Sequence, residues 1–203
     1  MAPSEPERPV VVPADPRWAA QAAELIAELR PVLGPPAVRV AHIGSTAIPG
    51  MAAKPVLDLQ VSVRELRELR EPFGSGLPAM GFVRLPYERD HVPAYLNDDP
   101  SRWAKRFWKR RGGPGADVNL HVRVCGSPNE RLALLFRDWF RAHPGAVAAY
   151  ARFKERLAGV VGDVETYADV KDPVVDLVIS VAEAWAEDTG WTVEATDRFG
   201  ARG

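Results

Sequence analysis

A glycine and a serine, Gly44 and Ser45, followed further on by Asp58, have the residue types and the order to bind phosphate and then a metal ion. Residues 38–43 before them are apolar and β-branched enough for a buried strand, and a glycine there lets the chain turn sharply. Ser45 would then open a helix or turn with free backbone N–H groups, which suit a triphosphate. We therefore predict a phosphate-binding turn at Gly44, Ser45 and Thr46.

Two segments must position the acid and its neighbours. Residues 56–63 alternate with period two, so Asp58 should point toward a polar region. Residues 117–124 also alternate, with His121 and Arg123 on the polar face. We expect this strand to lie near Asp58, which makes Asp58 and His121 candidate catalytic residues, with Asp58 as the metal ligand, and Arg123 a candidate phosphate ligand.

Further cations have two interpretations each. Lys54 either neutralises a phosphate or ends a solvated loop. Residues 102–111 mix arginines and lysines with aromatic residues, and a helix there would place Arg102, Arg106 and Arg110 on one face. Such a face binds phosphates or stacks a base, or it is an ordinary solvated surface. Arg106 and Arg110 are the candidates carried forward.

Residues 42–58, HIGSTAIPGMAAKPVLD, resemble the signature of the GrpB family, and residues 118–122, VNLHV, resemble a later block of that family. The resemblance extends over roughly residues 10–190. The chain is most similar to the GrpB-like domain that is fused to actinobacterial dephospho-CoA kinases. It has no Gly-x-x-x-x-Gly-Lys-Ser/Thr phosphate loop of its own, so kinase chemistry of that type is excluded.

The resemblance implies a nucleotidyltransferase-like fold and a nucleotide or CoA-like phosphorylated ligand. Enzymes of that superfamily hold two Mg²⁺ ions with a pair of acids on one strand and a third acid on a neighbour. Asp58 matches the first acid, whereas Gln60 occupies the second position and the neighbouring strand offers no acid on its polar face. The chain is therefore either a Mg²⁺-dependent nucleotidyltransferase with an incomplete carboxylate set or a non-catalytic helper of a dephospho-CoA kinase in coenzyme A biosynthesis.

Composition narrows the class of protein. The 203 residues are 46% apolar, which suffices for one sizeable core, and 26 basic residues balance 27 acidic ones. This balance argues against sequence-specific nucleic-acid binding. The single Cys125, the lack of a signal-like start and the lack of a long apolar run lead us to expect a cytoplasmic protein without a membrane span.

The pattern of elements predicts an α+β fold, with a mixed β-sheet flanked by helices and a helical C-terminal third. We expect one domain over residues 10–192, a disordered tail at 1–9 and a loose tail at 193–203. Proline and capping signals predict helices that begin near Asp15, Ser127 and Asp172. The patterns also predict strands at 38–43, 56–63, 82–86, 91–96 and 117–124, a helix at 64–71, and a helix through Val147, Tyr150, Phe153 and Leu157.

Overall fold

The computed structural model describes residues 8–68, 75–112 and 116–195. Five strands form one mixed sheet in the order β1-β2-β5-β4-β3. The strands are β1 (Ala37–Ile43), β2 (Val56–Val63), β3 (Val83–Leu85), β4 (Lys105–Arg110) and β5 (Asp117–Val124). Strands β2 and β5 are parallel, and the other neighbouring pairs are antiparallel. The predicted α+β fold with a mixed sheet is confirmed.

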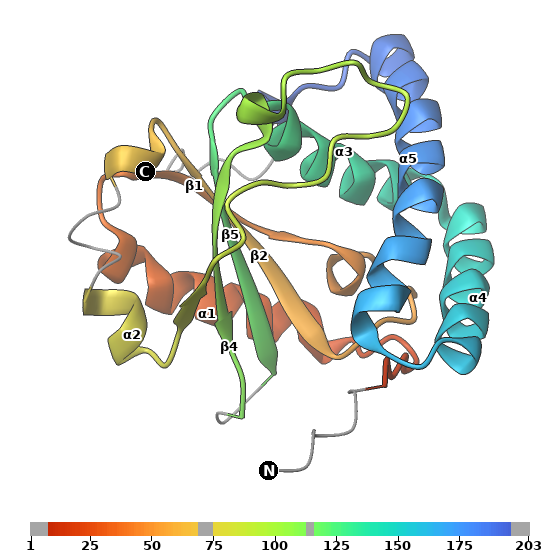
Figure 1. The fold of residues 1–203 in the computed structure, drawn as a ribbon, viewed down its shortest axis with the longest axis horizontal. Helices are drawn as coiled ribbons and strands as arrows, with labels where there is room; N and C mark the ends of the chain where they lie inside the picture. The colour runs from red at the N-terminus through yellow and green to blue at the C-terminus, as the bar shows by residue number, and fades with distance from the viewer. Residues whose placement is uncertain (1–7, 69–74, 113–115, 196–203) are drawn as a thin grey trace.

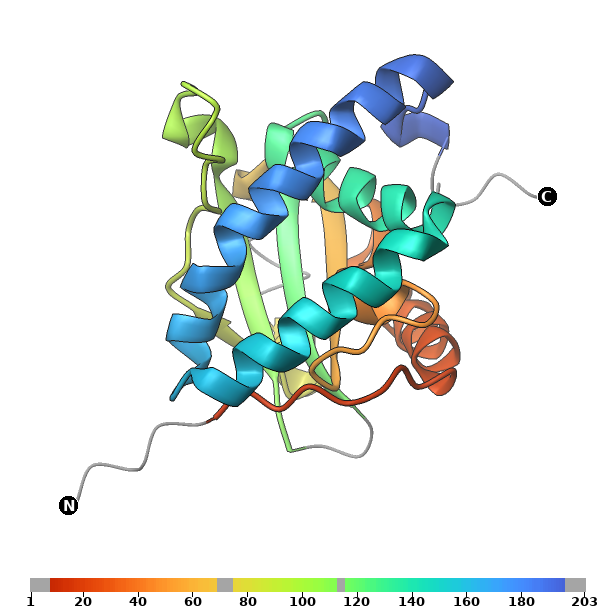
Figure 2. The same ribbon diagram turned by 90° about the vertical axis from the view of Figure 1, so that its right-hand side faces the viewer.

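Helices cover both faces of this sheet (Figure 1). Helix α1 (Arg17–Leu33) lies on one face, and Figure 2 shows α4 (Pro144–Val160) and α5 (Val164–Thr189) in front of the other. Helix α3 (Pro128–Ala142) packs beside α5, and the short α2 (Leu77–Ala79) lies near the sheet on the α1 side. The helical C-terminal third is also confirmed. No described helix is long and apolar enough to cross a membrane.

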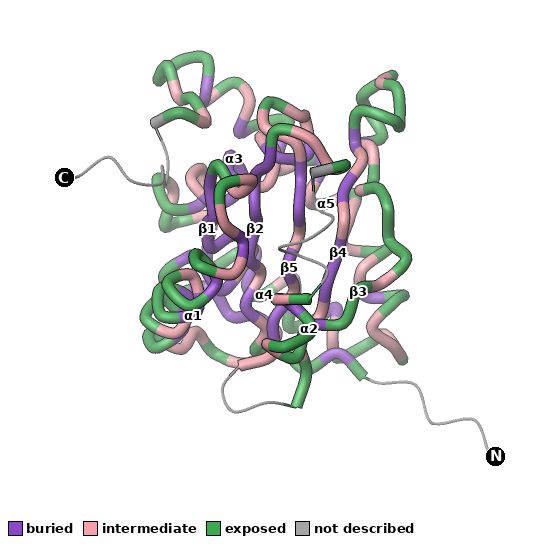
Figure 3. Tube along the Cα trace, turned by 90° about the vertical axis from the view of Figure 1, so that its left-hand side faces the viewer, coloured by how far each residue is buried: buried purple, intermediate pink, exposed green. Residues whose placement is uncertain are grey.

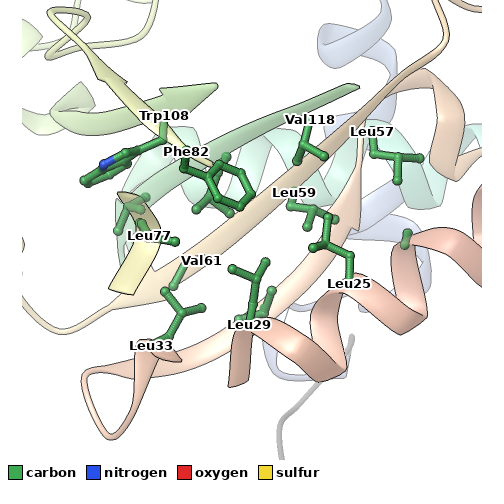
Figure 4. Close-up of a cluster of buried hydrophobic side chains, with 14 of the residues drawn as sticks. Leu25, Leu29, Leu33, Leu57, Leu59, Val61, Leu77, Phe82, Trp108 and Val118 are labelled. Carbon is green, nitrogen blue, oxygen red and sulfur yellow. The ribbon is translucent and has the colours of Figure 1, made fainter. Parts of the chain in front are cut away.

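The main apolar core lies between α1 and the sheet. Figure 4 shows leucines of α1 directed at apolar side chains of β2, with Phe82 and Trp108 closing one end. Leu29, Leu33, Leu59 and Val61 have no exposed surface. Alternation along β2 therefore gives this face to the core, and the opposite face to Asp58 and its polar neighbours. Figure 3 shows that the central strands consist of buried and intermediate residues.

Several predicted elements differ from the structure. Residues 105–110 form strand β4 instead of a helix, so Arg102, Arg106 and Arg110 do not share a helical face. Every residue of β4 pairs with β5, and Phe107 and Trp108 are buried on opposite faces of the sheet. Pairing with β5 thus overrode the helical spacing of the charges.

The predicted strand at 91–96 is also absent. This segment is a loop that the side chain of Asp176 holds, because its carboxylate accepts a hydrogen bond from the Ala94 backbone N–H and lies 3.0 Å from His91 Nε2. Proline at position 93 further disfavours strand pairing, since it has no N–H to donate.

Helix α5 begins earlier than predicted. Asp163 caps it by accepting a 2.7 Å hydrogen bond from the Thr166 N–H, and Pro173, the expected start, lies inside the helix. The buried Tyr167 ties the added turns to the fold. Of the predicted helix at 64–71, the described part is a 3₁₀ turn at Leu66–Glu68, and residues 69–71 lie outside the described residues.

The predicted tails fall mostly outside the described residues, which exclude 1–7 and 196–203. Just after the predicted N-terminal tail, Val12 pairs with Ala53 through two backbone hydrogen bonds of 2.9 Å. At the other end, Val193–Ala195 forms a 3₁₀ turn, and Val193 packs against a cluster that contains Ile43 and Leu134.

Candidate functional site

An open pocket of about 630 Å³ lies on the polar face of the sheet, opposite the α1 core. Its walls come from the ends of β1 and β2, from β5, from the loop before β4, and from helices α3, α4 and α5. The chain thus brings together segments that are distant in sequence. The predicted site residues that line this pocket are Gly44, Ser45, Thr46, Lys54, Asp58, His121 and Arg123.

Two predicted phosphate ligands lie elsewhere. Arg106 donates a hydrogen bond to the Lys105 carbonyl and lies 3.7 Å from Glu88. Arg110 stacks its guanidinium over the Phe82 ring at 5.1 Å. Both arginines alternate along β4 with the residues that face the pocket side, so the sheet places them on its other face. The structure does not bring them to the pocket.

Gly44 is where the backbone meets the acid most closely. Its φ of +69° is a conformation that L side chains rarely adopt, and a Cβ at this position would lie 2.6 Å from Asp58 Oδ2. Glycine is therefore required both for the positive φ of the turn and for the close approach of the backbone to Asp58. The side chain of Thr46 has a structural environment, since its hydroxyl lies 2.9 Å from His42 Nε2 and donates to the Val56 carbonyl.

Asp58 lies among polar partners. Its Oδ1 accepts a 2.7 Å hydrogen bond from the Asn119 amide and is 3.7 Å from His121 Nε2. Burial alone would raise the pKa of Asp58, but its contacts with His121 and Asn119 and the charge of Lys54 lower it below the ordinary value. Burial, with Arg123 beside the ring, lowers the pKa of His121 to about 4. Near neutral pH, Asp58 is thus an anion and His121 is uncharged.

Gln60 lies on the same face of the sheet as Asp58 but does not line the pocket. It has no exposed surface, its amide donates to the Glu130 carbonyl, and its Oε1 accepts a hydrogen bond from Arg123. Arg123 Nε also donates to Asp90 at 2.8 Å. The position that would carry a second metal-binding acid therefore holds an amide. This amide binds the backbone of α3 on one side and the guanidinium of Arg123 on the other.

Asp90 is the centre of a neutralised network. It binds Lys105 Nζ at 2.6 Å and Arg123 Nε at 2.8 Å, and it accepts a third hydrogen bond from Asn129. Burial alone would raise the pKa of Asp90, but the charges of Arg123 and Lys105 hold it far below its usual range. Two cations here share one carboxylate, and all of them line the same end of the pocket.

These residues do not fit the expected two-magnesium site. Asp58 is the sole carboxylate among the strand positions that face the pocket, and His121 alone is a poor complement for a hard cation. Within the described residues, no group of three or more His, Cys, Asp or Glu side chains could hold a metal ion. The donor set therefore departs from that of a two-metal enzyme.

Lys154 is the most unusual side chain of the pocket. It comes from the inner face of α4, is only 2% exposed, and donates a 2.8 Å hydrogen bond to Ser45 Oγ. Its other contact is the Tyr150 ring, at 5.2 Å. Burial, with the nearby charge of Lys171, lowers the pKa of Lys154 to about 7. Lys154 forms no ion pair with any described carboxylate, and the charges of Asp58 and Glu155 act on it only at longer range.

Lys154, Asp90 and Lys105 are not among the site residues predicted from the sequence. A usable signal for Lys154 was its position, because it continues the apolar stripe of α4 that includes Tyr150 and Leu157. A lysine on the buried face of a helix needs a partner. No comparable signal marked Asp90, which a loop carries into the site.

The chain has relatives among known proteins. The family model described as "GrpB protein" matches residues 8–180. The chain is 39% identical over 196 residues to a "Dephospho-CoA kinase" of Mycolicibacterium paratuberculosis, which covers 89% of this chain and 47% of that protein. It is 33% identical to "UPF0157 protein BH1888" of Halalkalibacterium halodurans, over 84% of this chain and 80% of that protein.

The chain spans about half the length of the kinases it matches. Among solved structures, the crystal structure of the conserved protein GrpB from Enterococcus faecalis has a TM-score of 0.67 at 24% identity, and it covers 87% of this chain and 99% of that one. The likeness in structure concerns the fold, whereas the family model and the sequence identities establish descent. The chain belongs to the GrpB family.

Proposed function

We propose that this GrpB-family protein binds a nucleotide or a CoA-like phosphorylated ligand in the pocket, with the phosphate groups at Ser45 and Lys154. The observation that carries the proposal is the buried ammonium of Lys154, which has a serine hydroxyl and an aromatic ring as partners but no carboxylate. A buried charge without a counter-ion is costly. An anionic ligand would offset that cost.

Two further lysines support a phosphate at this end. Lys54 lies 5.4 Å above the Tyr167 ring, and burial lowers its pKa, although Asp58 opposes that effect. Lys171 is 3.6 Å from Asp172 and lies near enough to Lys154 to lower that residue's pKa. Three ammonium groups thus line one end of the pocket. Phosphate oxygens accept hydrogen bonds from several such donors at once.

The rest of the pocket suits a larger organic group. Its volume of about 630 Å³ lies within the range of small-molecule sites. The walls also include the aromatic residues Tyr87, Trp103 and Phe136. Aromatic side chains pack against a base or a pantetheine-like chain. A ligand that carries both a phosphate and an organic group matches this combination of lysines and aromatic residues.

Calorimetric titration with ATP, CTP, GTP and dephospho-CoA tests the proposal. We expect one of these ligands to bind and Lys154→Met to weaken that binding about tenfold or more, as for the loss of a charge-assisted hydrogen bond. Arg156→Met is the matched control, because it removes an exposed cation from the same helix. Equal affinity of the two variants, or no heat with any ligand, would contradict the proposal.

Nucleotidyl transfer is a separate proposal that the donor set supports less well. It would need acids that the pocket side of β2 and β5 lacks, apart from Asp58. Incubation with labelled nucleoside triphosphates and analysis for incorporated nucleotide tests it. Incorporation that Asp58→Ala abolishes would establish an enzyme, whereas no incorporation together with binding would establish a ligand-binding protein.

A helper role beside a dephospho-CoA kinase is the second candidate. It is favoured by kinase relatives that are 36–39% identical and that this chain covers over only 47–48% of their length. The part of those proteins that it leaves uncovered is long enough for a separate domain. A pull-down with this chain as bait should then enrich a separately encoded dephospho-CoA kinase. Failure to bind the purified kinase would count against this role.

A further inference from the structure

The strand positions on the pocket side of the sheet carry more positive than negative charge. Register across β2, β5 and β4 aligns their side chains in rows, and one row consists of Asp58, Asn119 and Lys109. In the other two rows the members are neutral or cationic. These rows are Gln60, His121 and Phe107, and then Ser62, Arg123 and Lys105.

Arg123 has a fixed position in this array. It is 6% exposed, and its guanidinium binds Gln60 Oε1 on one side and Asp90 on the other, with His121 Nδ1 at 3.4 Å. Such a planar, permanently charged group is held by three neighbours. A cation of the chain therefore lies next to Gln60 and His121, beside the strand position where superfamily enzymes place their second acid.

The opposite end of the pocket supplies cations that form no ion pair within the described residues, although the charge of Asp58 acts on both at longer range. Lys154 donates to Ser45 Oγ, and Lys54 lies over an aromatic ring. Neither lysine forms an ion pair with a described carboxylate. Both line the pocket together with Ser45. These ammonium groups can neutralise phosphate directly, which is the task that Mg²⁺ performs in a two-metal site.

We infer that the pocket binds the oligophosphate part of its ligand as the free anion, without a divalent cation, and that the ammonium groups of Lys54 and Lys154 take the place of the metal. This inference rests on the proposed function, since it specifies how that same pocket holds phosphate. It concerns a ligand class: oligophosphates free of Mg²⁺, as the bare chain or as part of a nucleotide.

Two consequences separate this mode from metal-assisted binding. A Mg²⁺ ion that chelates the oligophosphate removes two negative charges, so the complex should bind these lysines more weakly than the free anion. Asp58, as an anion in the pocket, should repel the free anion, whereas in a metal site it would be needed for binding. Loss of its charge therefore has opposite effects in the two modes.

The experiment is calorimetric titration of the full chain with sodium tripolyphosphate and with ATP, each in EDTA and in excess MgCl₂. We expect the affinity in EDTA to exceed the affinity in Mg²⁺ by about threefold or more. Asp58→Asn should tighten binding in EDTA by a similar factor, and Lys154→Met should weaken it about tenfold or more. Thermal melting of each variant verifies that it is folded, and Arg156→Met serves as the unaffected control.

The affinities in EDTA and in Mg²⁺ distinguish three outcomes. Binding in EDTA that Asp58→Asn preserves or tightens supports the inference, and binding of tripolyphosphate alone shows that the phosphate chain suffices. Binding that requires Mg²⁺, or that Asp58→Asn abolishes, overturns the inference but leaves the proposed function intact. No binding of either probe under any condition, with the wild-type protein folded, overturns the inference, and the titrations with CTP, GTP and dephospho-CoA then decide the proposed function.

Discussion

The buried charges form ion pairs at one end of the pocket but not at the other. At the Asp90 end, Lys105 and Arg123 are each within 2.8 Å of a shared carboxylate, and Asn129 completes the network. At the Ser45 end, Lys154 is buried as deeply but has a hydroxyl and a ring as partners. The cations at the first end have a counter-ion without a ligand, whereas the ammonium group at the second end has no ion pair.

This difference separates structural from functional charge. A buried carboxylate that serves two cations joins the loop before β4 to β5 and α3, so its value lies in the fold. A buried ammonium without an acid destabilises the fold and persists where a ligand compensates for it. Four substitutions test this division, and the expected effect decreases from the first to the last.

Removal of the charge at Asp90 should have the largest effect. Asp90→Asn leaves Arg123 and Lys105 buried without their counter-ion, and we expect it to lower the free energy of unfolding by about 3–5 kcal/mol. Urea denaturation measures this. The control is Glu88→Gln, which removes an exposed partner of Arg84 and should cost no more than about 0.5 kcal/mol. Equal losses for both variants would show that the network is not structural.

The turn at Gly44 should be next in sensitivity. Gly44→Ala combines a positive φ with a Cβ 2.6 Å from Asp58 Oδ2, and we expect a loss of about 1–3 kcal/mol. Gly126→Ala is the matched control, because Gly126 has a φ of +77° but open space around its missing Cβ. If the two variants unfold at the same urea concentration, close approach to Asp58 is not the reason for glycine.

Lys154 should give stability a specific pH dependence. Its folded-state pKa of about 7 lies below the ordinary value of 10.5, so between these values the unfolded chain binds more protons than the folded one. Stability of the wild type relative to Lys154→Met should therefore rise with pH above about 7, by at most about 1.4 kcal/mol per pH unit. Urea denaturation of both proteins from neutral to alkaline pH measures this, and parallel curves would contradict it.

The smallest effect is expected on the other face of the sheet. Arg110 stacks on Phe82 away from the pocket, so Arg110→Ala should change the affinity for ATP or tripolyphosphate by less than about twofold. Calorimetric titration beside Lys154→Met makes the comparison direct. A large loss of affinity in Arg110→Ala would restore the original expectation that this arginine binds phosphate.

The sequence by itself determined the strands that carry chemistry. Period-two alternation placed Asp58 and Gln60 on one face of β2, and the same pattern placed His121 and Arg123 on one face of β5. Local signals also marked the turn at Gly44, whose positive φ requires glycine. These features depend on neighbours in the chain, so a pattern of nearby residues suffices to predict them.

Tertiary structure decided which charges meet. Arg106 and Arg110 have helical spacing, yet pairing with β5 made their segment a strand and turned both away from the pocket. Asp90 enters the site on a loop without a strong pattern, and Lys154 reaches Ser45 across 109 positions of sequence. Pairing and burial between distant segments cannot be read from local periodicity, because the energy of a charge depends on the neighbours that folding gives it.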